Sequence, residues 1–168
     1  AGILTEQQMA MLTSAYDSNE RQLEIINQLL YVARLDAGRI LLRKEVIDLS
    51  KLMNAVASDQ KQTAEERQQT IENTLPEHLA VMADPRYLRM VLDNLLGNAI
   101  KYTPEGGVIA LRAAIDGDYI ALSISDTGVG MDPGHITMIF DKFSRIENIL
   151  STDVNGSGVG LYLTKEII

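Results

Sequence analysis

The strongest pattern in the chain is a heptad spacing of apolar residues near its N-terminus. Between residues 5 and 37, these positions recur at alternating intervals of three and four: Met9, Leu12, Tyr16, Asn19, Leu23, Ile26, Leu30, Ala33 and Ala37, with Asn19 as the polar interruption. The spacing predicts one helix of roughly 50 Å, with no cap at its start and Gly38 as a candidate C-terminal cap. Such a stripe needs a bundle or dimer partner; the alternative is packing on the helix's own domain.

The rest of the chain alternates between short strand patterns and helical patterns. Strands are expected near residues 41–47, 69–73, 79–83, 106–115 and 119–126, with a hairpin turn at Asp116-Gly117-Asp118. Helices are expected from Asp48 or Ser50 to about Arg67, from Asp84-Pro85 to about Thr103, around residues 135–140, and from about Val159. The sequence therefore predicts one long helix followed by a layered α+β domain with mixed or antiparallel strands.

Composition and charge narrow the possible functions. The 168 residues carry a formal net charge of -8, which argues against a nucleic-acid partner that needs a basic face. The absence of cysteine excludes disulfides and thiolate metal sites. No apolar run is long enough to span a bilayer, so this piece is expected to be soluble. Both ends fall inside helical patterns, and we expect the chain to be part of a longer one that a membrane segment elsewhere could anchor.

The helix that begins at Asp84 carries polar residues that packing alone would not require. Asn94 and Asn98 lie four residues apart on one face of "DNLLGNAIKY", and Lys101 follows three residues later. Amide oxygens suit Mg²⁺, which completes its shell with water and substrate phosphate, and a lysine can contact the phosphates. The alternatives are a solvated face or a hydrogen bond between packed helices.

Two glycine-containing segments follow. In "SDTGVGM", a strand ends in Asp126, a carboxylate that could accept a hydrogen bond from the amine of adenine, with glycines that permit close approach of a flat ring. In "GSGVGLYL", three alternate glycines precede a helix, an arrangement suited to phosphates. Taken alone, the first segment could be a capped turn and the second a flexible loop before a helix.

In their order, these segments resemble the nucleotide-binding boxes of sensor histidine kinases from two-component signalling, within the Bergerat-fold ATPase superfamily. "NLLGNAIKYT" resembles the N box, "DTGVGM" and "GSGVGLYL" resemble the two glycine boxes, and "FDKF" resembles the F box. Upstream, "RQLEIINQLLYVARLDAGRILLRKEVIDLSKLM" resembles the second helix of a dimerisation and phosphotransfer hairpin that leads into the catalytic domain. The resemblance implies a truncated dimerisation helix over residues 1–40. It also implies a catalytic ATP-binding domain over residues 41–168, a two-layer α/β sandwich with a mixed sheet, truncated at its C-terminus.

The resemblance also implies roles for individual residues toward ATP and Mg²⁺. Asn98 would coordinate Mg²⁺ and Asn94 would support the metal and phosphate shell, in the position where water-hydrolysing relatives carry a glutamate. Lys101 would meet the phosphates and Tyr102 would border the nucleotide. Asp126 would accept from adenine, in a pocket shaped by Gly128 and Gly130.

The remaining implied nucleotide contacts lie in the second glycine box and the segment before it. They are Phe143, Gly156, Ser157, Gly158, Val159, Gly160 and Leu161. Residues 141–158 would form the ATP lid, in which Arg145 is a candidate contact of the γ-phosphate; the alternative is an exposed lid arginine.

The family's phosphoacceptor motif, of the type H-E-[LF]-R-T-P, is absent. His78 and His135 are the two histidines, and neither has the acidic neighbour and helical setting of an acceptor, so both are expected at the surface. We expect the acceptor to lie upstream of Ala1; the alternative is a kinase that lacks one.

The resemblance thus implies a cytoplasmic histidine kinase core that forms a homodimer through its N-terminal helix and passes phosphate to a response-regulator receiver domain. Two alternatives remain open: a serine kinase of the anti-sigma-factor type, and an ATP-binding pseudokinase or conformational module.

Overall fold

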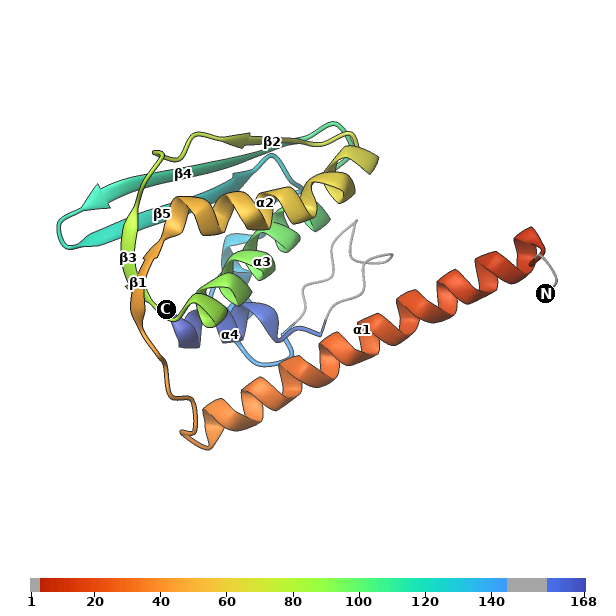
Figure 1. Cartoon of the computed structure of the whole chain (residues 1–168), viewed down its shortest axis with the longest axis horizontal. Helices are drawn as coiled ribbons and strands as arrows, with labels where there is room; N and C mark the ends of the chain where they lie inside the picture. The colour runs from red at the N-terminus through yellow and green to blue at the C-terminus, as the bar shows by residue number, and fades with distance from the viewer. Residues whose placement is uncertain (1–3, 145–156) are drawn as a thin grey trace. The chain divides into compact units, whose positions relative to one another are not determined.

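The computed structural model describes residues 4–144 and 157–168, which form two compact units, Ala1–Ile40 and Leu41–Ile168 (Figure 1). The first unit contains α1 (Glu6–Asp36). The second contains β1 (Glu45–Asp48), α2 (Leu49–Glu66), β2 (Thr70–Asn73), β3 (Ala80–Ala83), α3 (Pro85–Tyr102), β4 (Val108–Asp116), β5 (Tyr119–Asp126), two 3-10 segments and α4 (Gly160–Ile167). The boundary coincides with the expected domain boundary, while the role of the first unit as a dimerisation helix stays a prediction.

The long N-terminal helix forms as predicted, but the expectation of an uncapped start is wrong. Thr5 is the N-cap, and its side chain and that of Gln8 bond to each other's backbone N–H groups in a capping box. At the other end Gly38 adopts φ +63°, and the N–H of Arg39 donates to the carbonyl of Arg34 over 2.8 Å, which is the predicted glycine cap.

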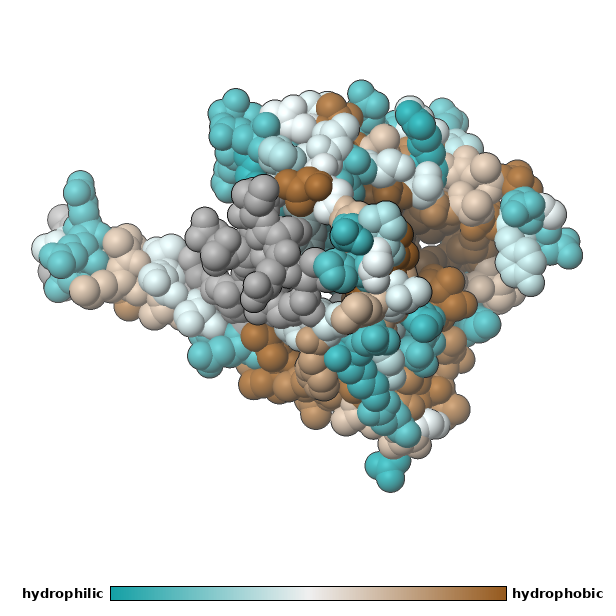
Figure 2. Space-filling model, turned by 180° about the vertical axis from the view of Figure 1, so that it is seen from behind, coloured by the Kyte–Doolittle hydropathy of each residue, from teal (hydrophilic) through white to brown (hydrophobic). Residues whose placement is uncertain are grey.

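The apolar seam of α1 remains exposed. Leu12, Leu23, Ile26 and Leu30 each leave 50–54% of their surface accessible. In Figure 2 the visible part of α1, at the left of the view, mixes apolar and polar residues. Within the described part of the chain, no helix is long and apolar enough to cross a membrane.

The second unit contains two sheets. The larger has the order β2-β4-β5, with β2 parallel to β4 and β4 antiparallel to β5, while β1 pairs antiparallel with β3. The helices lie on one side of the larger sheet in Figure 1, and α4 packs against α3. The expected α+β class, with helices layered on a mixed sheet, is therefore confirmed.

Two elements differ from their predicted form. The first strand begins at Glu45, because its partner β3 ends at Ala83, the residue opposite Glu45, where the Asp84-Pro85 helix start takes over. The helix expected around residues 135–140 is two 3-10 segments, Pro133–His135 and Met138–Phe140. Each is a single turn closed by backbone hydrogen bonds between residues three apart, and Gly134 inside the first disfavours a continuous α-helix.

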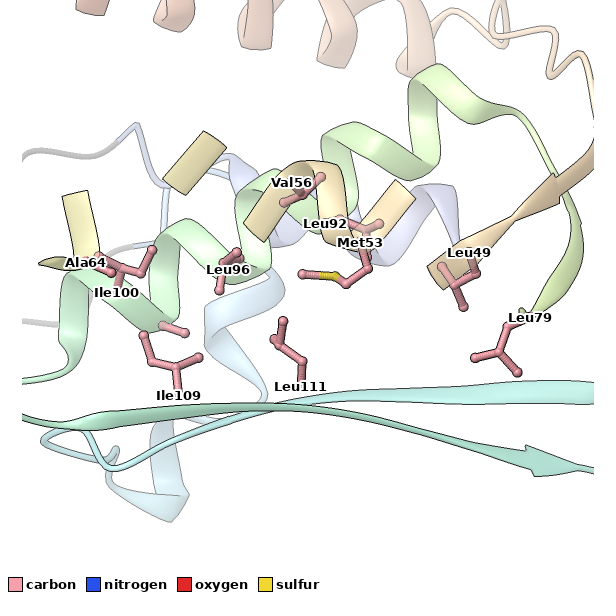
Figure 3. Packing of buried hydrophobic residues seen from close by; sticks show 11 residues of the cluster. Leu49, Met53, Val56, Ala64, Leu79, Leu92, Leu96, Ile100, Ile109 and Leu111 are labelled. Carbon is pink, nitrogen blue, oxygen red and sulfur yellow. The ribbon is translucent and has the colours of Figure 1, made fainter. Parts of the chain in front are cut away.

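The core of the second unit lies between the helices and the sheet (Figure 3). Leu49, Met53 and Val56 follow helical spacing along α2, and Leu92, Leu96 and Ile100 do so along α3. Ile109 and Leu111 rise from β4 to meet them, and neither has accessible surface. Because the apolar stripe of α3 is used here, its opposite face is left for polar residues.

The start of α3 is fixed by Asp84, which is only 3% exposed. Its carboxylate accepts hydrogen bonds from the backbone N–H of Arg86 at 3.0 Å and of Arg43 at 2.9 Å, and the Arg86 guanidinium lies 3.3 Å away. The hydrogen bond from Arg43, followed by those from Arg86, lowers the pKa of Asp84 to about 2. Asp84 thus joins the beginning of the second unit to the helix that carries the candidate site.

We expect Asp84→Asn to lower the melting temperature at pH 7 by about 4 °C. Asparagine still caps a helix, but its amide nitrogen would oppose the N–H of Arg43 or Arg86. Because the folded pKa lies below the ordinary value of 3.8, the charged carboxylate stabilises the fold above that value, and this contribution is lost as the pH falls toward 2. Calorimetry should therefore find the difference from wild type shrinking below about pH 4. Asp118→Asn in the hairpin turn is the control. If the difference in melting temperature between Asp84→Asn and wild type stayed constant with pH, the stabilising role of the charged Asp84 carboxylate would be contradicted.

Candidate nucleotide site

The polar face of α3 presents the residues singled out in its sequence. Asn94, Asn98 and Lys101 are all half-buried, at helical spacing opposite the core stripe. The Asn98 side-chain amide makes no hydrogen bond to another described residue. The Lys101 ammonium lies 4.8 Å from the centre of the Tyr102 ring. A half-buried amide without a partner at this place is available to a ligand.

Asn94 contacts α4, where its hydrogen-bond partner lies seventy positions later in the sequence. Its Nδ2 donates to the hydroxyl of Thr164 over 2.9 Å. A Cβ atom on Gly160 would lie 1.9 Å from the Asn94 Oδ1, so glycine is required where the two helices meet. This contact brings the N-box helix and the second glycine segment together.

The first glycine segment is held against the C-terminal end of α3. Asp126 ends β5, and one of its carboxylate oxygens accepts from the N–H of Gly128 at 2.9 Å. The N–H of Val129 donates to the Tyr102 carbonyl over 3.2 Å. A Cβ on Gly128 would lie 2.6 Å from that same carbonyl oxygen, whereas Gly130 meets no close neighbour but has φ +68°. The two glycines are thus required for different reasons, close approach and backbone conformation.

The C-terminal end of α3 is held in turn by Gln69, a residue that sequence reasoning missed. Gln69 is 6% exposed, and its Nε2 donates to the carbonyls of Ile100 at 2.9 Å and Thr103 at 2.6 Å. These carbonyls belong to the last turn of α3, where intrahelical donors are lacking. Gln69 therefore satisfies the helix end on which the first glycine segment rests.

The second glycine segment packs against the F-box region. Gly158 has φ +69°, and a Cβ there would lie 2.8 Å from the backbone carbon of Phe143. Phe143 itself is 59% exposed. The Val159 side chain is fully buried, Leu161 is half-buried, and the hydroxyl of Ser157 accepts from the Val159 N–H at 3.3 Å. Gly156 and Arg145, with most of the expected lid, lie outside the described residues.

A cluster of charged residues joins α2 and α3 beside Asn94. The Arg89 guanidinium bonds to Asp59 of α2 and lies 3.3 Å from the carboxylate of Asp93. Partial burial raises the pKa of Asp93, and Arg89 opposes that effect. The cluster helps to fix α3 on α2.

Neither histidine lies where a phosphoacceptor is expected. His78 is exposed and its Nδ1 lies 2.9 Å from the Asp48 carboxylate, which caps α2. This hydrogen bond is the largest of the effects that lower the pKa of Asp48. His135 is exposed at the end of the first 3-10 segment.

Comparison with known proteins finds similar chains among histidine kinases and sensor proteins. The circadian input-output histidine kinase CikA of Synechococcus elongatus is 34% identical over 170 residues, 99% of this chain and 22% of that protein. The sensor protein GacS of Pseudomonas syringae pv. syringae is 31% identical over 172 residues, 98% of this chain and 19% of that protein. The chain therefore spans about a fifth of the length of these curated relatives.

Among solved structures, the crystal structure of full-length ShkA in complex with AMPPNP is similar, with a TM-score of 0.81 and 33% identity. The match covers 99% of this chain and 34% of ShkA. Residues 83–168, from the end of β3 to the last residue, match the family described as histidine kinase-, DNA gyrase B-, and HSP90-like ATPase. The sequence resemblance is thus confirmed, and the chain belongs to this ATPase family.

Proposed function

We propose that this chain binds Mg-ATP and is the catalytic part of a histidine protein kinase. The observation that carries the proposal is that both glycine segments meet the polar helix α3. One is joined to it by the Val129–Tyr102 hydrogen bond, and the other by the close contact of Gly160 with Asn94, beside the Asn94–Thr164 hydrogen bond. Relatives named as histidine kinase and sensor protein match nearly the whole chain.

The adenine base would be read by Asp126. This side chain is exposed at the end of β5, and its second oxygen accepts no hydrogen bond from another described residue. A carboxylate with a vacant acceptor suits the exocyclic amine of adenine. Gly128 and Gly130 would leave room for the ring, with Tyr102 at its border.

The donor set on α3 fits a magnesium ion. Within residues 4–144 and 157–168, no group of three or more His, Cys, Asp or Glu side chains could hold a metal. The amide oxygen of Asn98, supported by Asn94 one turn earlier, would be the protein ligand, with water and phosphate completing the shell. When bound, Mg²⁺ offsets charge on the phosphates. The positive charge of Lys101 would act in the same direction.

The phosphates would lie along the second glycine segment. Ser157, Gly158, Val159, Gly160 and Leu161 would follow the triphosphate at the beginning of α4, with Phe143 beside them. Gly156 and Arg145 are proposed for this role from the family resemblance.

The chemistry would be in-line transfer of the γ-phosphoryl group to a histidine on a dimerisation helix. A nitrogen–phosphorus bond forms while the bond from phosphorus to the bridging oxygen breaks, and ADP leaves. A neutral imidazole is already a nucleophile, so the residues described above need only hold and orient the nucleotide. An amide at position 94, where water-hydrolysing relatives carry a glutamate, fits a kinase that spares ATP from hydrolysis.

The exposed seam of α1 supports a homodimer through this helix in the longer protein. Neither His78 nor His135 is proposed as acceptor, so the acceptor would lie elsewhere in the longer chain. The phosphoryl group would pass from it to an aspartate on a response-regulator receiver domain.

The test is to incubate the 168-residue chain with γ-labelled ATP and a dimerisation-domain fragment that carries an acceptor histidine. Label on the fragment that is lost in acid and kept in base is expected, because phosphohistidine has these properties. Acid-stable label would indicate a serine kinase, and bound ATP without transfer would indicate a conformational module. Either result would overturn the proposal.

A further inference from the structure

We infer that Thr164, together with Gly160, is a positioning residue that fixes the Asn94 side chain for the nucleotide site. The inference rests on the proposed function, because it assigns Asn94 to the magnesium and phosphate shell. Thr164 belongs neither to a glycine segment nor to the polar face of α3. Its role is indicated only by the packing of α3 against α4.

Gly160 and Thr164 lie one turn apart on the same face of α4 and form what we call the Asn94 socket. The Thr164 residue is 9% exposed, and its hydroxyl accepts from Asn94 Nδ2 at 2.9 Å. The backbone of Gly160 lies against the Asn94 amide so closely that a Cβ would stand 1.9 Å from Oδ1 and 2.7 Å from Cγ. The amide is thus held at its nitrogen and confined along its length.

The socket holds both ends of the Asn94 amide, the nitrogen through the Thr164 hydroxyl and the oxygen against the backbone of Gly160. With Nδ2 donating to the Thr164 hydroxyl, moving the amide out of this contact would sacrifice a hydrogen bond in a half-buried position. Asn98, four residues later, has no such restraint among the described residues. The two asparagines therefore differ: Asn94 is held in advance, and Asn98 is free to adjust when the ion arrives.

The socket also couples the two sides of the site. Gly160 is the first residue of α4 and directly follows Ser157–Val159, the proposed phosphate segment. Holding Asn94 in the socket therefore sets the position of that segment relative to Asn98. Loss of the Thr164 hydroxyl should impair the magnesium-dependent part of nucleotide binding more than the part that needs no metal.

The experiment measures the dissociation constant of AMPPNP by titration calorimetry, once with magnesium and once with EDTA. The ratio of the two constants is the gain in affinity from magnesium, and it is compared between the wild-type chain and its variants. Thr164→Val should reduce the gain from magnesium by about fivefold to tenfold, which corresponds to loss of one orienting hydrogen bond. Thr164→Ser, which keeps the hydroxyl, should retain the wild-type ratio. Thr74→Val is the matched control, because it removes a hydroxyl that donates to the Leu111 carbonyl at 3.2 Å at the far end of β2.

An unchanged magnesium ratio in Thr164→Val would overturn the inference, as would equal losses in the valine and serine variants. A second measurement needs no variant. Exchange of the side-chain amide hydrogens, followed by NMR, should be slower for Asn94 than for Asn98, and equal rates would also overturn it. If the wild-type chain binds no AMPPNP, the proposed function fails, while the exchange rates still test the socket by itself.

Discussion

Replacing Asp126 by asparagine is expected to weaken ATP binding by about 10- to 100-fold, with little change in the melting temperature. The wild-type carboxylate uses one oxygen to accept from the Gly128 N–H at 2.9 Å. Asparagine keeps an oxygen for that hydrogen bond, so the loop conformation is preserved. Its NH₂ group, however, replaces the oxygen proposed to accept from the adenine amine, and two donors would then face each other.

Titration calorimetry with ATP and GTP analogues distinguishes base recognition from loop support. In the Asp126→Asn variant the preference for adenine over guanine should fall, because guanine offers a carbonyl oxygen in place of the amine. Asp132→Asn is a matched control, since Asp132 also accepts from a glycine two residues later, the N–H of Gly134 at 2.7 Å. Unchanged ATP affinity in Asp126→Asn would limit that residue to shaping its own loop.

Much of the fold could be predicted because its signals are local. Asp84-Pro85 marks the beginning of α3 through a cap and a fixed proline φ, and the spacing of Leu92, Leu96 and Ile100 determines which face is buried. Strand limits were less predictable. β1 begins at Glu45 because its partner β3 ends opposite that residue, at Ala83, and this limit depends on the partner strand rather than on the apolar pattern of residues 41–47.

The candidate site also has a part that the sequence predicts and a part that it does not. The sequence indicates the proposed ligand-binding residues by their types and order: Asn94, Asn98, Asp126 and Gly158. It does not indicate the neighbours that hold these residues in place, because those neighbours are distant in sequence and of common residue types. Thr164 resembles any helix threonine, and Gln69 resembles any glutamine that precedes a strand, until the structure shows their side chains bonded to residues of α3.

Glycines show why residue type alone is insufficient. Gly128 and Gly130 are equivalent in the motif, but only Gly128 is required by close approach, to the Tyr102 carbonyl. Gly130 is required by its positive φ. That distinction depends on the position of the α3 C-terminus, which Gln69 holds and which no local pattern reveals.

The Asn98→Ala substitution is expected to raise thermal stability while abolishing most of the magnesium dependence of nucleotide binding. In a helix interior alanine is favoured over asparagine by roughly 0.5 kcal/mol, which corresponds to an increase of about 2 °C in melting temperature. No hydrogen bond to another described residue is lost, because the Asn98 amide makes none. Removal of the proposed magnesium ligand should reduce the gain in AMPPNP affinity from magnesium by at least about 100-fold.

The opposite signs of these two effects are the distinctive part of the prediction. A residue that serves packing loses stability and function together, whereas an amide kept for a ligand costs stability and is retained for binding. Asn54→Ala on α2 is the matched control, because it gains the same helix propensity but loses the hydrogen bond that Asn54 accepts from Asn73 at 2.6 Å. Its stability should change little and its magnesium response not at all. A lower melting temperature for Asn98→Ala would assign the amide to the fold, and an unaltered magnesium response would remove Asn98 from the metal site.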